Sequence, residues 1–388
     1  MAVVGVRTTG NIQQERRVVD MAKEIALLDP KIAPFITILK RIKGGGATRV
    51  VHSPEFKWLE DDYVATSTTA AATAEAGATA ITVADGSIFR VNDIVKVPAT
   101  GETMLVTAVS GNNVTVTRSW GDTEAAQIPN AAELLNIGSA MSENSLARAR
   151  VSTQEVVRSN YTQIFRTPFE LSRTEDFSEM YGGKDRAYQR RKALAEHKRD
   201  IARAIYFGEK AAGVDAVTGA PKRTMGGLIE AIKKDGLTHG FSAGGTDLTY
   251  ANFNANVAKR VFEHGSDEKL LVCGGKLAAA IDSWDIGAAR GDMGADKTYG
   301  VHVTKLITSY GILDVVYDPL LTGETYGGYG LVLDMDNIRY AHLAGSDTKL
   351  RTNIQPNDQD GVMDEYLTEC SVEIKLPKTH MLITGAYV

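Results

Sequence analysis

Closely spaced runs of alternating apolar and polar residues predict a compact all-β module over residues 77–140. Turn sequences separate these runs at residues 85–86 and 111–113, and Asn92 suits a sharp turn because asparagine tolerates a positive φ. The flank TSTTAAATAEAGATA, residues 66–80, is small, polar and of low complexity, so we expect a linker there. The strand signals are Ile81 with Val83, Ile94 with Val95 and Val97, Met104 to Val106, and Val114 with Val116.

Extended patterns flank this module and predict a long two-stranded loop that carries the module at its tip. Residues 48–62 form the first strand, which Pro54 limits to a sheet edge or a strand start. Residues 151–171 form its partner, which we expect to be one long strand. An insertion at such a tip is tolerated because lengthening an exposed loop adds little closure entropy. The alternating positions of the long strand are Val157, Tyr161, Phe165 and Phe169.

Residues 184–209 predict a long amphipathic helix, and the second half of the chain predicts mixed helices and strands. A strand at 269–274 precedes a helix at 276–284, and Tyr310 with Gly311 can reverse the chain into a hairpin. Strands over 366–376 and 380–388 close the chain, which gives an α+β fold class. The apolar face of the long helix comprises Ala187, Leu194, Ile201 and Ile205.

The N-terminal segment predicts an arm. Residues 13–29 have helical apolar spacing that Pro30 and Pro34 interrupt, and a second apolar run, 35–42, ends in the flexible glycines 44–46. Such an arm docks on a neighbouring subunit or packs on its own domain, and the residues alone leave both alternatives open.

Composition narrows the function classes. The chain has 388 residues, of which 43% are hydrophobic and 23% charged, with a formal net charge of −5. No apolar run is long enough to span a bilayer, and we expect no secretory signal at the N-terminus. Only Cys273 and Cys370 are present, so a disulfide framework or a zinc site is not expected. The negative charge argues against a dedicated nucleic-acid binder but permits a local basic face.

No catalytic or ligand-binding motif holds. The segment VCGGKLAA has neither the first glycine nor the Ser/Thr of a phosphate loop, and NDQDG at 357–361 lacks two ligands of a calcium loop. The seven histidines show no ligand spacing. We therefore expect a protein without enzymatic activity, metal or cofactor, whose arm, loop and long helix contact other subunits.

Two charged segments are candidate contact sites. Residues 184–203 are strongly basic and could lie against DNA through counterion release, although a solvated face or ion pairs to neighbouring subunits is the favoured interpretation. Their DNA-facing or intersubunit candidates are Arg186, Arg190, Arg191, Lys198, Arg199 and Arg203. Glu60, Asp61 and Asp62 cannot all face one cation because strand side chains alternate, so a solvated turn or an intersubunit ion pair is expected.

Four segments in this order resemble the major capsid proteins of tailed bacteriophages with the Hong Kong 97-type fold, in the branch with a β-module inserted in the extended loop. The segments are IALLDPKIAPFITILKRI, FKWLEDD, SNYTQIFRTPFELSRT and YLTECSVEIKLPKTHMLITG. The resemblance runs from about residue 25 to the C-terminus. It implies an N-terminal arm, an extended β-loop, a peripheral domain with a long spine helix, and an axial domain. The implied bounds are 1–46 for the arm, 47–76 with 141–182 for the loop, 77–140 for the module, 183–229 with 345–388 for the peripheral domain, and 230–344 for the axial domain.

The resemblance implies a structural subunit that assembles into hexamers and pentamers of an icosahedral head around double-stranded DNA. The implied partners are further copies of the chain, portal and scaffolding proteins, a decoration protein and packaged DNA, with no membrane. Assembly is expected in the host cytoplasm, and the product is the virion capsid. No lysine, asparagine and glutamate trio matches the covalent crosslinks of some members, so we expect none. The alternatives are a surface-binding adhesin, whose module would have few aromatic rings for sugars, and a hydrolase with dispersed catalytic residues.

Overall fold

The computed structural model divides the chain into two compact units, each with its own core. We call Leu59–Val157 the barrel unit, and Met1–Trp58 with Arg158–Val388 the body. The described residues are 35, 39, 48–146, 152–178, 184–241, 248–284 and 303–385.

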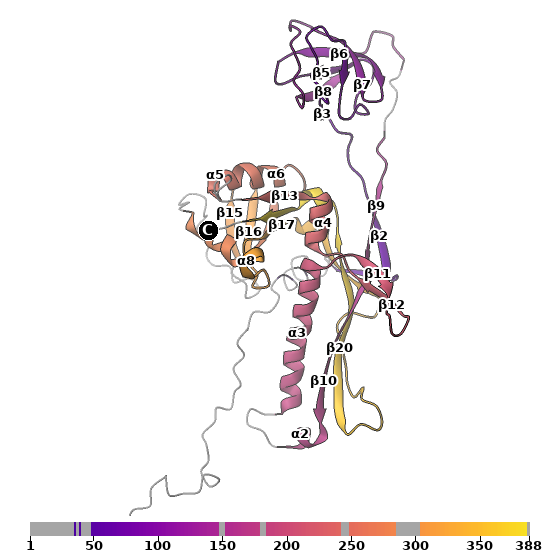
Figure 1. Ribbon diagram of the computed structural model, residues 1–388, viewed down its shortest axis with the longest axis vertical. Coiled ribbons are helices and arrows are strands. Elements are labelled where there is room, and N and C mark those ends of the chain that lie inside the picture. Colours follow the sequence, from indigo (N-terminus) through magenta and orange to yellow (C-terminus); the bar gives the residue numbers. More distant parts are fainter. Residues whose placement is uncertain are drawn as a thin grey trace, which may run out of the picture. The chain divides into compact units, whose positions relative to one another are not determined.

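The barrel unit contains a six-stranded antiparallel sheet with the order β3-β8-β5-β6-β7-β4 (Figure 1). The sheet closes on itself because Ala70 pairs with Val83, next to the ends of β3 and β4. Asn92 has a φ of 70°, as the turn prediction requires, and Gly111 turns the chain between β6 and β7 with a φ of 57°. The strands are β3 (Ser67–Thr69), β4 (Ala80–Thr82), β5 (Asp93–Lys96), β6 (Thr103–Ser110), β7 (Asn113–Thr117) and β8 (Glu133–Ser139).

The expected linker at residues 66–80 is wrong, because much of it belongs to the barrel. Strand β3 pairs with β8, and Ala70 and Ala74 are buried in the barrel core. The amide of Ala74 donates to Ile128 O at 2.9 Å, and that of Ala71 donates to Thr82 O at 2.9 Å. The small side chains that gave the segment low complexity allow this close packing against the closing strands.

Arg118 and Glu102 form an ion pair inside the barrel unit. Arg118 Nε donates to Glu102 Oε1 at 2.7 Å, and Nη2 donates to Oε2 at 2.6 Å. The side chain of Glu102 is fully buried, which would raise its pKa, but the bonds from Arg118 and two backbone amides lower it. The other guanidinium N–H groups donate to the carbonyls of Glu75, Ala78 and Ala126. One side chain thus joins the start of the barrel to its last loops.

Two larger sheets build the body. The spine sheet has the order β1-β18-β20-β10, with β19 also paired to β20. Its strands are β1 (Thr48–Val51), β10 (Gln163–Ser172), β18 (Ile338–Leu343), β19 (Lys349–Arg351) and β20 (Gly361–Ile374). The central sheet has the order β13-β21-β17-β14-β16-β15 and mixes parallel with antiparallel pairs. Its strands are β13 (Leu237–Gly240), β14 (Glu268–Cys273), β15 (Val303–Ile307), β16 (Ile312–Tyr317), β17 (Gly330–Leu333) and β21 (Met381–Thr384).

Two small sheets and a set of helices complete the described residues. The two-stranded sheets are β2 (Glu55–Glu60) with β9 (Val156–Tyr161), and β11 (Ala211–Val214) with β12 (Pro221–Thr224). The α-helices are α2 (Arg173–Phe177), α3 (Asp185–Phe207), α4 (Leu228–Asp235), α5 (Tyr250–Phe253), α6 (Lys259–Val261), α7 (Gly275–Ser283) and α8 (Gly323–Tyr326). The other helical turns are η3 (Asn254–Ala258), η5 (Met335–Asn337) and η6 (Pro377–Thr379).

The central sheet separates two hydrophobic cores, because successive side chains of a strand point to opposite faces. Leu270 and Val272 of β14 face a core that they share with α3, α4 and the spine sheet, which we call the body core. Leu271 and Cys273 face a second core with α7 and the α5–α6 segment. Residues predicted in the peripheral and axial domains therefore meet in one body core.

Helix α3 confirms the predicted long helix and lies along β10 and β20 (Figure 1). Ile201 and Ile205 are buried as expected, but the placement of Ala187 on the apolar face is wrong, since it is exposed. The N-terminal turns instead direct arginine side chains at β20. Gly208 ends the helix where a Cβ atom would lie 2.4 Å from Ala204 O and 2.6 Å from Met225 O. The buried helix residues are Ala193, His197, Ile201, Ala202, Ile205 and Tyr206.

The single long strand expected over 151–171 is wrong, because the chain changes partners in the middle. Strand β9 pairs with β2, as predicted, whereas β10 pairs with β20. Thr162 lies between them, and its amide donates to Pro54 O at 2.8 Å while its hydroxyl donates to Glu369 at 2.6 Å. Thr162 thus contacts both partners at the point where the chain passes from one pairing to the other.

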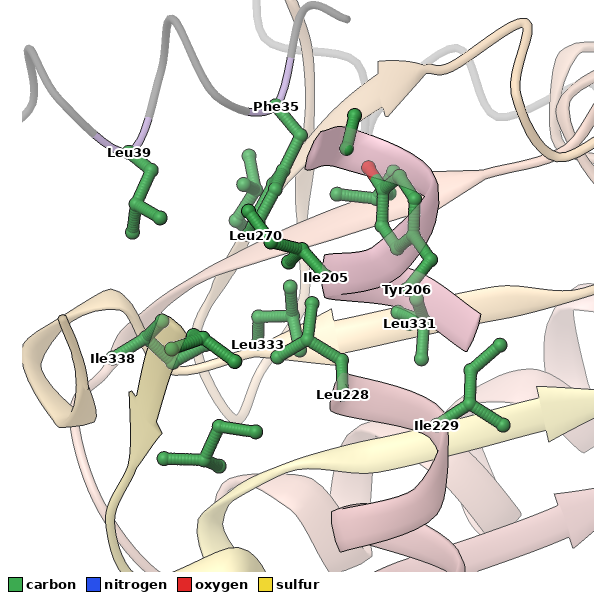
Figure 2. Close-up of a cluster of buried hydrophobic side chains, with 14 of the residues drawn as sticks. Phe35, Leu39, Ile205, Tyr206, Leu228, Ile229, Leu270, Leu331, Leu333 and Ile338 are labelled. Atoms are coloured by element: carbon green, nitrogen blue, oxygen red, sulfur yellow. The ribbon is translucent and has the colours of Figure 1, made fainter. Parts of the chain in front are cut away.

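Most of the predicted arm lies outside the described residues, but Phe35 and Leu39 are fully buried in the body core. Figure 2 shows both side chains directed into this core. The ring of Phe35 lies 5.4 Å from that of Tyr206, whose hydroxyl donates to Asp318 at 2.7 Å. The Phe35 amide also donates to Asp318, whose pKa burial raises. At these two positions the chain packs on its own body.

We predict that Arg118→Ala destabilises the barrel unit by about 3–5 kcal/mol, because it leaves the Glu102 carboxylate buried without its cation. Hydrogen-exchange mass spectrometry of peptides from β6 and β7 in the full chain measures this loss. Lys96→Ala, on the exposed face of β5, is the control and should change protection by less than about 0.5 kcal/mol. Equal protection in both variants would contradict the role assigned to Arg118.

Candidate functional site

Two of the candidate DNA-facing or intersubunit residues, Arg186 and Arg190, bind a carboxylate of their own chain. Arg186 donates from Nη2 to Asp364 Oδ1 at 2.9 Å, and Arg190 donates from Nη2 to Oδ2 at 2.9 Å. The Nε atom of each arginine also donates to Oδ2, at 3.1 Å. Because the two arginines lie one turn apart on α3, both reach the same fully buried residue on β20.

The protonation of Asp364 follows from these contacts. Burial would raise its pKa, but hydrogen bonds from Arg186, the Asn353 amide and Arg190 outweigh burial and hold the pKa below its ordinary value. The same pair raises the pKa of Arg186. The carboxylate is therefore ionised at neutral pH and acts as the anion that fixes α3 on the spine sheet.

His197 makes the second polar contact between α3 and the spine sheet. Its Nδ1 lies 2.8 Å from Thr167 Oγ1 on β10, and its Nε2 lies 2.7 Å from Thr368 Oγ1 on β20. Burial lowers its pKa, which favours the neutral imidazole that can donate at one nitrogen and accept at the other. His197 is therefore a fully buried structural residue that joins the helix to both β10 and β20.

The opposite face of β20 carries a second set of carboxylates, spaced four residues apart. Glu365 and Glu373 are buried, and Glu369 accepts the Thr162 hydroxyl at 2.6 Å. Each buried member contacts two cations, all from other segments except Lys375, which directly follows β20. The pairs are Glu365 with Arg166 at 2.6 Å and Arg351 at 3.4 Å, and Glu373 with Arg49 at 2.6 Å and Lys375 at 3.2 Å. We call Glu365, Glu369 and Glu373 the acidic row.

The other basic candidates on α3 differ from Arg186 and Arg190. Arg191 and Lys198 are exposed and lie seven residues apart, on the same side of the helix. Arg203 is exposed and lies 3.7 Å from Asp200 in an i,i+3 pair. Arg199 is half-buried. The predicted basic face therefore divides into two arginines that hold the body together and a set that remains at the surface.

The acidic candidates lie at the end of β2. Glu60 is the last residue of that strand and is half-buried, while Asp61 and Asp62 are exposed. Asp61 accepts the Asp62 amide at 2.9 Å, and Asp62 accepts the Tyr63 amide at 2.9 Å. Both bonds join adjacent residues in an irregular segment, so the choice between a solvated turn and an intersubunit ion pair stays a prediction.

The described residues contain no group of side chains arranged to hold a metal ion, and at the GGK segment two amides that a phosphate would require already donate to a carbonyl. No group of three His, Cys, Asp or Glu side chains among them is arranged to hold a metal ion. At the GGK segment, the amides of Lys276 and Leu277 both donate to Gly327 O, so the first turn of α7 is already occupied. No helix among the described residues is long and apolar enough to cross a membrane.

Sequence reasoning missed Asp364 and the acidic row. A signal was present in the sequence, because a largely apolar strand is interrupted by four carboxylates. These are Asp364, Glu365, Glu369 and Glu373. A carboxylate on a buried strand position requires a cation or several donors. The partners lie more than a hundred residues away for Arg186, Arg190, Arg166 and Arg49, so local spacing does not identify them.

We expect Asp364→Asn to lower the free energy of unfolding of the unassembled chain by about 1–3 kcal/mol, because two guanidinium groups lose a charged acceptor. Chemical denaturation near neutral pH measures the change. The matched control is Asp360→Asn, whose exposed pair with Arg173 contributes at most about 1 kcal/mol. Since the folded pKa of Asp364 is depressed, its contribution is complete above about pH 4 and is lost as the pH falls through the folded value. A difference from wild type that does not narrow below about pH 4 would contradict this assignment.

Comparisons with known proteins agree with this architecture. The major capsid protein of Pseudomonas phage PaMx41 is 27% identical over 335 residues, which cover 81% of this chain and 79% of that protein. Among solved structures, the capsid of the native GTA particle matches with a TM-score of 0.52 and 10% identity over 96% of both chains. The cyanophage A-1(L) capsid matches with a TM-score of 0.52 and 10% identity over 97% of this chain and 99% of that chain.

At such low identity the solved structures show the fold alone, which is the Hong Kong 97-type fold of phage capsid proteins. A family model described as SU10 major capsid protein matches residues 3–387, which is nearly the whole sequence. This family match supports the capsid interpretation rather than the adhesin. The chain therefore belongs to the SU10 major capsid protein family.

Proposed function

We propose that this chain is the main structural subunit of a tailed-phage head, in which hexamers and pentamers form an icosahedral shell around double-stranded DNA. The family match over residues 3–387 is the observation that carries this proposal. The arrangement of charges supports it, because buried carboxylates of β20 fix a long helix and several distant segments to one sheet. Such a body resists deformation, as a shell subunit must, and a subunit of this kind needs no enzymatic activity or cofactor.

The proposed layout assigns residues 1–46 to the arm and 47–76 with 141–182 to the extended loop. The module at 77–140 would be an insertion in that loop, and the barrel core includes the nearby Ala70 and Ala74 as well. Residues 183–229 with 345–388 would form the peripheral domain around α3. Residues 230–344 would form the axial domain, built on the central sheet.

We further propose that portal and scaffolding proteins, a decoration protein and packaged DNA are the other partners, and that assembly occurs in the host cytoplasm. Glu60, Asp61 and Asp62 would form ion pairs with a neighbouring copy. On α3, the proposed DNA contacts are Arg191 and Lys198, which are exposed, whereas Arg186 and Arg190 are committed to Asp364. Arg199 and Arg203 would serve intersubunit contacts or DNA.

Expression of the chain, alone and together with neighbouring genes of its source, tests the main proposal. We expect closed or partial shells, or capsomers of five and six copies, in light scattering and negative-stain microscopy. A species of only 41.8 kDa under both conditions would contradict the proposal, because a shell subunit must associate when its partners are present.

The DNA contact predicts a salt effect. Replacing Arg191 and Lys198 with glutamine should reduce the slope of log affinity for duplex DNA against log salt by about 1 for each residue, since each releases counterions on binding. Filter binding of capsomers to random duplex DNA over a range of salt concentrations measures this slope. Lys96→Gln, in the barrel unit, is the control. An unchanged slope in the double variant would exclude this pair as a DNA contact.

A further inference from the structure

The two edges of the central sheet differ in charge. Strands β13 and β15 stand at opposite ends of the sheet, and in the described residues each pairs with a single neighbour. Copies related by rotation in a ring make heterologous contacts, in which one side of a subunit meets a different side of the next. A ring that joined copies through this sheet would therefore bring the β13 side of one copy against the β15 side of the next.

The β15–β16 side carries an excess of negative charge. Asp314 pairs in register with Lys305, and Lys305 Nζ also lies 3.7 Å from Glu268 Oε1. One lysine therefore faces two carboxylates. Asp314 Oδ1 is buried and has no hydrogen-bond partner among the described residues, and burial raises the pKa of Asp314. Ile307, on the same face of the sheet, is 45% exposed. We call Glu268, Lys305, Ile307 and Asp314 the acidic edge.

The β13 side carries an excess of positive charge. Arg260 extends to this strand and donates to Thr238 O at 3.4 Å. Lys233 and Lys234 are exposed in the last turn of α4, just before β13, while Asp235 pairs with Arg158. His239 Nε2 is buried without a hydrogen-bond partner in the described part of the chain. We call Lys233, Lys234, His239 and Arg260 the basic edge.

We propose that the acidic edge of one copy binds the basic edge of the next copy around each capsomer, with Glu268 and Asp314 facing Arg260 and Lys234. This proposal rests on the proposed function and identifies the contact by which the ring closes. The occupant is a second copy because both complementary charge patterns belong to the same sheet. Contact with the next subunit covers Ile307, which is exposed in the single chain.

Charge reversal tests the contact. The acidic-edge variant is Glu268→Lys, and the basic-edge variant combines Lys234→Glu with Arg260→Glu. Each places like charges at every junction, so the fraction of chain in particles should fall about tenfold or more. The chain that carries all three substitutions should recover particles, because opposite charges meet again. Lys222→Glu, on the β11–β12 hairpin, changes the net charge without touching either edge and should assemble like wild type.

Mixing the two reversed variants gives a sharper test. The acidic-edge variant has net positive charge on both edges, and the basic-edge variant has net negative charge on both. Copies that alternate around a ring restore opposite charges at every junction, which is possible with six copies and impossible with five. We therefore expect the mixture to form hexamers without closed shells, since an icosahedral shell also needs pentamers.

Thermal melts followed by circular dichroism check that each variant folds, and Asp314→Asn, which preserves size, replaces Glu268→Lys if the latter does not fold. Assembly of both reversed variants at wild-type yield would overturn the contact and leave the proposed function intact. Loss of particles without recovery in the triple variant would also overturn it, and would point to a scaffolding or portal protein as the partner. Failure of the wild-type chain to form particles with its neighbouring genes would overturn the contact and the proposed function together.

Discussion

The burial of charged groups on β20 is the constraint on which the rest of the body depends. Asp364, Glu365 and Glu373 are almost inaccessible to water, and a buried carboxylate is stable only with cations or several donors. Each of the three contacts two basic side chains, which come from β1, β10, β19, α3 and the end of β20 itself. A single strand thereby determines where four other segments lie.

The two faces of β20 make different contacts because successive side chains of a strand point to opposite sides. On the face toward α3, Asp364 and Thr368 make polar contacts with the helix. Further along the same face, the side chains lie in the body core; they are Cys370, Val372 and Ile374. The opposite face carries the acidic row. The helix is held at its first turns by ion pairs, in its middle by His197 and at its end by apolar packing around Ile205 and Tyr206. This gradient explains why the arginines near its start are unavailable to other partners.

Sequence patterns predicted the elements with strong local signals and failed where distant segments decide. The long helix, the hairpin turn at Tyr310 and Gly311, and the turn at Asn92 follow from spacing and backbone preference. The division of 151–171 into two strands depends on Pro54 and Glu369, which are remote in sequence. The sequence did not predict that Ala70 and Ala74 are buried in the barrel core, because small residues are typical of linkers as well as of closely packed strands. The basic face of α3 was recognised, but its division into internal and surface arginines depends on Asp364, which local spacing cannot locate.

The closed barrel has a consequence for how such a chain can evolve. Its described strands form a closed sheet, its interior is filled by its own apolar side chains, and the Arg118 side chain bonds both to Glu75 near its start and to Ala126 near its end. Among the described residues, every side chain of that core lies within Leu59–Val157. During evolution the sequence of this unit can therefore change, or the unit can be replaced, without compensating substitutions in the body. The exposed turn at Gly111 and Asn112 also offers a point at which foreign peptides can be inserted for display.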